Sequence, residues 1–247
     1  MTRRILISIA VVVCALAIGP AAARAQGGPP LMTDDPGTPE PGTWEVNVAV
    51  TGDFTPGTGA YELPVLDVNY GAGSRVQLTA AVPVAFQHSS GEGTHGRLGE
   101  IETGAKWRFV DAGAALPVDV STFPKLVFHP GVGGPAEDTE LLLPLEAARE
   151  MGPFAVNVDA GRVFQRHAGQ RWFYGAAFQY APAERMQWLA EVHVETGTED
   201  GTVRFLNAGF RRDLDAHRIL MFSIGRSVFR GGAAGETVAY LGVQFHG

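Results

Sequence analysis

The chain has 247 residues, with 19 Lys and Arg against 26 Asp and Glu, and a formal net charge of −7 at pH 7. This acidic balance excludes a nucleic-acid-binding surface, because phosphate groups require basic partners. The single cysteine, Cys14, excludes a disulfide framework.

The first 25 residues have the pattern of a secretory signal peptide. Arg3 and Arg4 precede the apolar stretch 5–18, and Ala23 and Ala25 form a small-x-small cleavage site. The apolar stretch is shorter than the roughly 20 residues that a helix needs to span a bilayer. We therefore expect cleavage after residue 25 and export of a mature chain that has no cysteine.

Residues 26–42 form a Pro-rich segment that cannot pair regularly, because proline lacks a backbone N–H. This segment is either a disordered periplasmic leader or a plug that folds back into a lumen. Within it, Asp34 and Asp35 could bind calcium through carboxylate oxygens, or they could shape a turn before Pro36.

From residue 43 onward, apolar and polar residues alternate in segments of roughly nine to twelve residues. In the clearest segment, Leu78 and Val82 fall on one face and Gln77 and Thr79 on the other. The pattern predicts twelve strands and no helix. The expected ranges are 43–51, 61–70, 74–87, 99–110, 118–129, 139–149, 153–165, 170–180, 186–195, 203–211, 218–228 and 236–245.

Such alternation fits either a soluble β-sandwich or a barrel that turns its apolar face toward lipid. The export signal favours the barrel. We predict an all-β fold over residues 43–247, a transmembrane antiparallel up-and-down β-barrel of about twelve strands in the bacterial outer membrane. Such a protein would contact outer-membrane lipid and lipopolysaccharide and would be inserted by the barrel assembly machinery.

The connections predict which end of the barrel faces outward. Alternate connections, at 52–60, 88–98, 130–138, 166–169, 196–202 and 229–235, are longer and richer in glycine than those between them. Outer-membrane barrels have short periplasmic turns and longer external loops, so the N-terminus is expected in the periplasm.

Aromatic residues fall near the predicted strand ends, where headgroup-level girdles are expected. The inner girdle would contain Trp44, Tyr70, Trp107, Phe109, Tyr180, Trp188 and Phe245, and the outer one Phe86, Trp172 and Tyr174.

The stretch from Thr33 to Asn47, TDDPGTPEPGTWEVN, directly precedes the first strand. With the signal peptide and the later strands, it resembles a family of outer-membrane β-barrels labelled as transporters of the meta-pathway of phenol degradation. The resemblance implies a small exported barrel that passes aromatic or other hydrophobic compounds. One departure concerns the assembly signal, because Phe245 is followed by His246 and Gly247, whereas barrels commonly finish on an aromatic residue.

The predicted inward face carries both signs of charge. It presents Glu45, Asn47, Asp67, Asn69, Arg75, Gln77, Glu100, Glu102, Lys106, Arg108, Asp119, Lys125, Glu140, Glu146, Asn157, Asp159, Arg171, Gln179, Glu191, His193, Glu195 and Arg211. These residues either pair with one another and fill the lumen, or line a narrow polar path. In such a path, Glu100 and Glu102 would face Lys106 and Arg108 further along the strand and set solute preference.

Glu191, His193 and Glu195 share one face of one strand at i, i+2 and i+4. They could hold a divalent metal or act as an acid–base pair, or they could be ordinary solvated charges. His129 could join them only if its strand lies nearby.

The function these patterns favour is a passive outer-membrane channel or transporter for small molecules, with hydrophobic or aromatic compounds among the candidates. Loops 88–98 and 130–138 are the expected gates, and the entry segment 26–42 is a further candidate gate. We expect no cofactor and no enzymatic activity. One alternative is a closed structural or loop-binding barrel without conductance. Another is a membrane-embedded lipid hydrolase with a Ser-His pair on the lipid-facing wall. Its candidates are Ser223, Ser227, His129 and His193, although no nucleophile motif surrounds any of them.

Overall fold

The structure is a computed structural model, and it describes residues 28–89, 93–113, 115–130, 137–165, 170–198, 201–228 and 235–247. The predicted signal peptide lies outside these residues. Within the described ranges every regular element is a β-strand. No helix among them is long and apolar enough to cross a membrane.

The strands build a closed antiparallel barrel with twelve strand positions around its wall, which confirms the predicted fold class. The strands are β1 (Trp44–Thr55), β2 (Thr58–Gly71), β3 (Val76–Ser89), β4 (Gly93–Leu98), β5 (Ile101–Val110), β6 (Asp119–Thr122), β7 (Lys125–His129), β8 (Glu137–Met151), β9 (Phe154–Gln165), β10 (Arg171–Ala183), β11 (Met186–Thr198), β12 (Gly201–Asp213), β13 (Arg218–Ser227) and β14 (Thr237–His246). β4 and β5 together occupy one of these positions, interrupted at Gly99–Glu100. β6 and β7 occupy another, interrupted at Phe123–Pro124.

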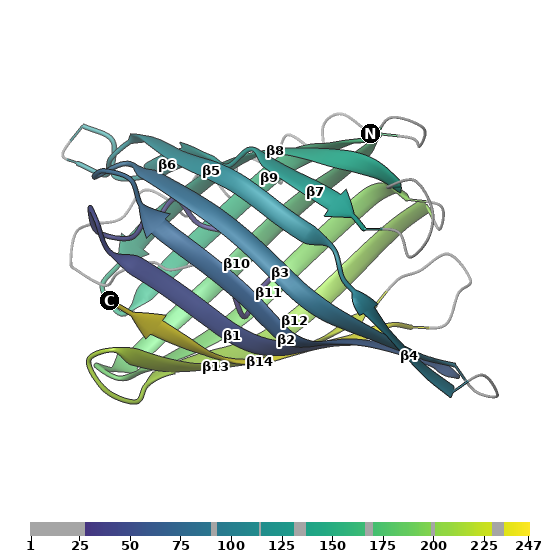
Figure 1. Cartoon of the computed structure of the whole chain (residues 1–247). Coiled ribbons are helices and arrows are strands. Elements are labelled where there is room, and N and C mark those ends of the chain that lie inside the picture. Colours follow the sequence, from purple (N-terminus) through teal and green to yellow (C-terminus); the bar gives the residue numbers. More distant parts are fainter. Residues whose placement is uncertain are drawn as a thin grey trace.

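At each position the strand pairs with its neighbours in sequence, and β1 closes the barrel by pairing with β14 (Figure 1). Val48 lies opposite Val243 in this closing pair. We call the end where β1 begins and β14 finishes the terminal end, and the opposite end the far end. Because the strands form one closed sheet, the alternative of a soluble sandwich is wrong.

The barrel is apolar outside and polar inside. On β3, Leu78 and Val82 are exposed on the outer face, whereas Gln77 and Thr79 are buried in the lumen, as the alternation predicted. Large apolar side chains are exposed all round the wall, among them Leu66, Leu126, Leu145, Phe178, Leu206, Ile224 and Leu241. An outward apolar band of this kind is the surface that a membrane barrel presents to lipid.

Aromatic rings gather on the outer face at the terminal end, where one girdle was predicted. Trp44, Trp107, Phe109, Tyr180, Trp188 and Phe245 are exposed there, together with Phe154. The rings also contact one another across strands, as in Trp44–Tyr70, Phe154–Tyr180 and Trp188–Phe210, and along β5 in Trp107–Phe109. Toward the far end, Trp172 and Tyr174 are exposed and Phe86 stacks on Tyr61.

Two predicted far-end loops are strand instead. β1 and β2 continue to a turn at Pro56 and Gly57, so most of 52–60 is paired. Most of 88–98 is also strand, because β4 pairs with β3 over residues 93–98 and is exposed throughout. Figure 1 shows β4 extending past the barrel wall rather than across the lumen. The expected contrast in loop length is therefore largely replaced by longer strands. Of the second predicted gate, 130–138, residues 131–136 lie outside the described residues.

Candidate functional site

The lumen contains the chain's own N-terminal segment, residues 28–43, which we call the luminal segment. Its backbone is hydrogen-bonded to side chains on β9, β11, β12 and β13, and its first carboxylate reaches lysines on β5 and β7. The segment therefore crosses the barrel interior from one wall to the opposite one.

The first wall binds the backbone of the segment. Ser223 on β13 donates its hydroxyl to the carbonyl of Pro30 at 2.5 Å, and Arg211 on β12 donates to the carbonyl of Pro29 at 3.3 Å. Glu191 on β11 accepts from two consecutive amides, those of residues 32 (3.2 Å) and 33. Asp159 on β9 accepts from the amide of residue 34 at 3.3 Å. Four wall side chains thus replace the strand partners that prolines deny this segment.

Two side chains of the segment fit features of the same wall. Leu31 packs with Ala177 and Leu189 in a small apolar cluster within an otherwise polar lumen. Thr33 is fully buried against Gly175, where an added Cβ would lie 2.2 Å from the threonine hydroxyl oxygen. The missing side chain at position 175 therefore makes room for the segment.

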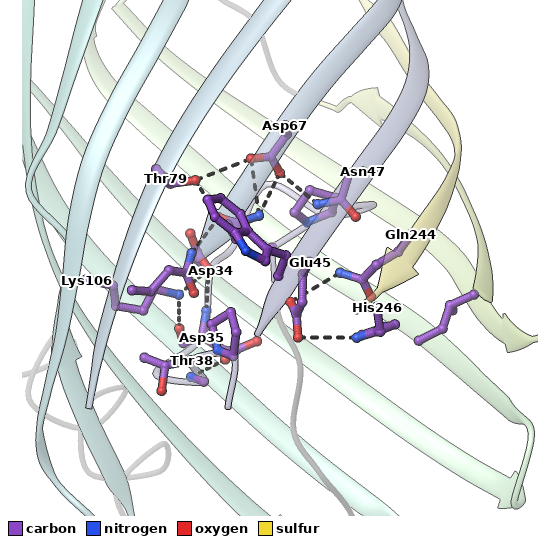
Figure 2. Close-up of a pocket in the computed structure, with 18 of the residues that line it drawn as sticks. Asp34, Asp35, Thr38, Glu45, Asn47, Asp67, Thr79, Lys106, Gln244 and His246 are labelled. Carbon is purple, nitrogen blue, oxygen red and sulfur yellow. Dashed lines mark hydrogen bonds and ion pairs between the residues drawn. The ribbon is translucent and has the colours of Figure 1, made fainter. Parts of the chain in front are cut away.

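The opposite wall holds the carboxylate of Asp34. Lys106 Nζ on β5 donates to Asp34 Oδ1 at 2.8 Å, and Lys125 Nζ on β7 lies 3.5 Å from Oδ2 (Figure 2). Lys106 also donates to the carbonyl of Asp35. Both ammonium groups lie over the ring of Phe123, at 4.7 and 4.4 Å from its centroid. Two cations therefore clamp one carboxylate of the segment.

This environment moves the pKa values of the two aspartates in opposite directions. Burial raises the pKa of Asp34, but the charges of Lys106 and Lys125 and the bond from Lys106 lower it more, to about 2. Burial also raises the pKa of Asp35, and with repulsion from Asp34 it outweighs Lys106 and Arg211, giving about 6. The Asp35 carboxylate accepts from the amide of Gly37, as in an Asx turn. Because lysines surround the Asp34 carboxylate, the contacts give the calcium interpretation no support, and the bond from Gly37 favours the turn interpretation for Asp35.

A group of buried polar atoms beneath the segment has no hydrogen-bond partner among the described residues. It comprises Thr33 Oγ1, both amide atoms of Asn157, Asp159 Oδ1, His193 Nδ1 and Asn207 Oδ1.

A cavity of about 1290 Å³ lies beside the segment. It extends from Glu62 and Glu100, on the far-end side of Lys106, to Thr43 and His246 at the terminal end. Its wall combines polar and apolar side chains. The polar part includes a network in which Asn47 donates to Asp67 at 2.7 Å (Figure 2). Gln77 donates to Asn69, and Asn69 donates to Asp67, in the same network. The segment thus fills only part of the lumen.

A chain of ionic contacts crosses the opposite part of the lumen toward the far end. It runs from Glu100 to His129 (3.1 Å), Glu140 (3.9 Å), Arg171 (2.6 Å), Glu195 (4.0 Å) and His193 (3.6 Å). The chain joins the interruption between β4 and β5 to β7, β8, β10 and β11, so these side chains connect parts of the wall to one another.

The four predicted selectivity residues, three on β5 and Glu100 directly before it, have different surroundings. Lys106 is 3 % exposed and is held by Asp34 and by Glu146, 3.6 Å away. Glu102 pairs with Lys125 at 3.2 Å, and Arg108 pairs with Asp111 at 2.9 Å. Glu100 is the most exposed. All four line the cavity.

The three predicted residues on β11 do not act as one unit. Glu191 is 2 % exposed and binds the luminal segment, whereas His193 lies beside Glu195 in the ionic chain. Among the described residues, no three His, Cys, Asp or Glu side chains are arranged to hold a metal ion. The metal interpretation of this strand therefore has no support in the geometry.

The hydrolase alternative required serines on the lipid-facing wall. Ser223 and Ser227 are instead buried in the lumen, because they alternate with the exposed Ile224 and Arg226 along β13. Ser223 donates to Pro30, and Ser227 accepts from the amide of Glu236. Both hydroxyls stabilise the fold, and the lipid-facing placement is wrong.

Sequence reasoning did not identify Leu31, Gly175 or Ser223 as parts of one site. These three residues lie outside the motif 33–47. The motif nevertheless pointed to the neighbouring part of the segment, because its first acidic residue, Asp34, contacts the lumen wall.

The fold and its polar lumen define a porin-like β-barrel of the outer-membrane type. No family model and no curated protein sequence matches the chain. Among solved structures, it is similar to an outer-membrane channel of Pseudomonas putida F1, with a TM-score of 0.66 and 14% identity over 90% of this chain and 100% of that one.

The chain is also similar to the KdgM porin, with a TM-score of 0.58 and 11% identity over 81% of this chain and 98% of that one. The translocator domain of the autotransporter NalP from Neisseria meningitidis gives a TM-score of 0.57 and 9% identity, over 82% and 88%. At these identities the likeness establishes the fold. It leaves the phenol-degradation label untested.

Proposed function

We propose that this protein is a bacterial outer-membrane channel through which small molecules diffuse passively. The observation that carries the proposal is the cavity beside the luminal segment, which extends from Glu62 and Glu100 to Thr43 and His246. A continuous polar space along a barrel axis can conduct water and small solutes.

The location in the outer membrane is supported by the apolar outer band and by the aromatic girdle at the terminal end. The orientation we propose has the terminal end in the periplasm. It is supported by the hairpins that continue past the barrel at the far end, since external connections of such barrels are the longer ones.

The cargo we propose is small and hydrophilic. The cavity is lined by carboxylates, amides and lysines such as Glu102, Asp67, Asn47 and Lys106. These groups offer hydrogen bonds and charges to a hydrophilic solute, and they alternate with apolar side chains such as Val65, Phe123 and Ile219. This proposal differs from the aromatic or hydrophobic cargo that the family resemblance implied.

Conductance of the refolded chain in a planar bilayer tests the proposal. Discrete, reproducible steps are expected, small because the segment narrows the lumen. A barrel that inserts correctly but stays silent would contradict the channel. It would favour the second candidate, a closed barrel without conductance, for which the buried pairing of Lys106 with Asp34 is the supporting observation.

A further inference from the structure

We propose that the lumen wall formed by β9 to β13 is a peptide-binding site, and that residues 29–34 are its built-in ligand, which a free peptide of the same chemistry can replace. This inference goes beyond the channel function and does not require the barrel to conduct.

The wall recognises a turned backbone. The amide of Leu31 donates to the carbonyl of Gly28, and the amide of Gly28 donates to the carbonyl of Thr33, both at 3.0 Å. Arg211 and Ser223 donate to the consecutive carbonyls of residues 29 and 30, and both of these residues are prolines, which have no N–H to satisfy. Glu191 accepts from the amides of residues 32 and 33, and Asp159 from that of residue 34. Donors therefore face carbonyls and acceptors face amides, as in a site shaped for peptide.

Side chains add a sequence requirement to this backbone pattern. The cluster of Ala177 and Leu189 accepts one apolar side chain, that of Leu31. The space over Gly175 accepts a small hydroxyl residue, Thr33. Lys106 and Lys125, across the lumen, hold the carboxylate of Asp34. The ligand class is a peptide of the pattern Pro-Pro-apolar-any-Thr-Asp that folds into the same turn, with an acidic last position.

The bound segment is suited to exchange. Its backbone is held by hydrogen bonds from single wall side chains, and water can replace each of these bonds when the segment leaves. The buried apolar cluster between the segment and the wall contains only one side chain of the segment, that of Leu31. The segment is joined to β1 through residues 35–43, so its tether supplies a high local concentration. A free peptide must therefore compete with a tethered one.

The test measures binding of a fluorescent peptide with the sequence of residues 28–38 to the full chain in detergent, by anisotropy. The unmodified chain is compared with the Leu31→Asp variant, whose own segment would place a carboxylate in the apolar cluster. We expect the variant to bind the peptide at least about tenfold more tightly than the unmodified chain, because its own segment competes poorly. Asp34→Asn also weakens docking of the chain's own segment, so this variant too is expected to bind the peptide more tightly than the unmodified chain.

Matched controls locate the binding in the wall. In the Leu31→Asp background, Glu191→Gln should abolish peptide binding, whereas Glu195→Gln should preserve it, since Glu195 pairs with Arg171 and His193 rather than with the segment. A peptide with Asp at the position of Leu31 should not bind.

Equal affinity for the unmodified and variant chains would overturn the proposal. So would absence of binding to Leu31→Asp and Asp34→Asn chains that migrate as folded barrels. Because anisotropy does not depend on conductance, a silent barrel that binds peptide would refute the channel and leave the peptide site intact.

Discussion

Lys106 Nζ donates a hydrogen bond to Asp34 Oδ1 at 2.8 Å, and this contact joins the luminal segment to the wall opposite the one that holds its backbone. The lysine side chain is 3 % exposed. A buried ion pair of this kind fixes position, because removing either member leaves the other charge uncompensated.

Lys106→Met should therefore release the segment. Loss of a buried partner costs about 3–5 kcal/mol, and the segment can escape that cost by withdrawing its carboxylate into water. We expect faster hydrogen exchange of the amides of residues 32–34, measured by mass spectrometry. Arg75→Met is the matched control, since its pair with Asp111 is exposed and contributes at most about 1 kcal/mol. Unchanged exchange in Lys106→Met would show that the backbone contacts suffice.

Docking of the segment should depend on pH with two opposite slopes. The pKa of Asp35 is raised to about 6 from 3.8, so its ionisation opposes docking above pH 6, and docking strengthens as pH falls from about 6 toward 4. A shift of this size corresponds to about 2–3 kcal/mol. The pKa of Asp34 is lowered to about 2, so its contribution is complete above about pH 4 and is lost as pH falls toward 2.

Amide protection of residues 32–34, corrected for intrinsic exchange, should therefore be greatest near pH 4 and weaker at pH 7 and at pH 2. The groups facing Asp35 are Lys106, Asp34 and Arg211. Asp35→Asn should remove the change between pH 7 and 4 and preserve the loss below 4. A profile that Asp35→Asn leaves unaltered would assign the upper transition to another group.

Gly175→Val should expel the segment and leave the barrel folded. An added Cβ would meet Thr33 Oγ1 at 2.2 Å and Asp159 Oδ1 at 2.3 Å, distances that require one neighbour to move. Since Thr33 is on the segment, withdrawal relieves the larger clash, at a cost of about 1–3 kcal/mol to docking. Larger single-channel conductance is the expected readout. Gly113→Ala, where the nearest atom is 4.0 Å away, should have no effect. A barrel that fails to fold would instead show that the strands take up the strain.

The ion preference of the channel should depend on Glu102. Its side chain is 29 % exposed in the cavity and lies 3.2 Å from Lys125. Glu102→Gln would leave that lysine less compensated, so the reversal potential should shift toward anions. A change of roughly twofold to fivefold in permeability ratio matches a contribution of about 0.5–1 kcal/mol from a partly exposed charge.

Glu195→Gln provides the control for this shift. Glu195 is equally exposed, 29 %, but it belongs to the ionic chain rather than to the cavity lining. Equal shifts for Glu102→Gln and Glu195→Gln would place the conducting path elsewhere in the lumen.

The alternation of side chains was sufficient to predict the number of strands and the face that each residue occupies. Gln77 and Thr79 are inside and Leu78 and Val82 outside because a strand has a period of two, and this holds whatever its neighbours are. Strand ends were less accessible. The turn at Pro56 and Gly57 lies within 52–60, where glycines and polar residues resemble a loop, yet pairing between β1 and β2 continues through them.

The local sequence therefore determined an inside-out barrel with a polar lumen. What fills the lumen was decided by the tertiary structure. Asp34 contacts Lys106, 72 positions away, and Glu191 binds the amide of Thr33, 158 positions away. Such contacts depend on closure of the ring, which brings β5, β9 and β11 around one space. A local sequence pattern does not show which residues, so far apart in the chain, will meet. The prolines only exclude regular strand pairing of the segment, and the shape and charge of the wall decide where it docks.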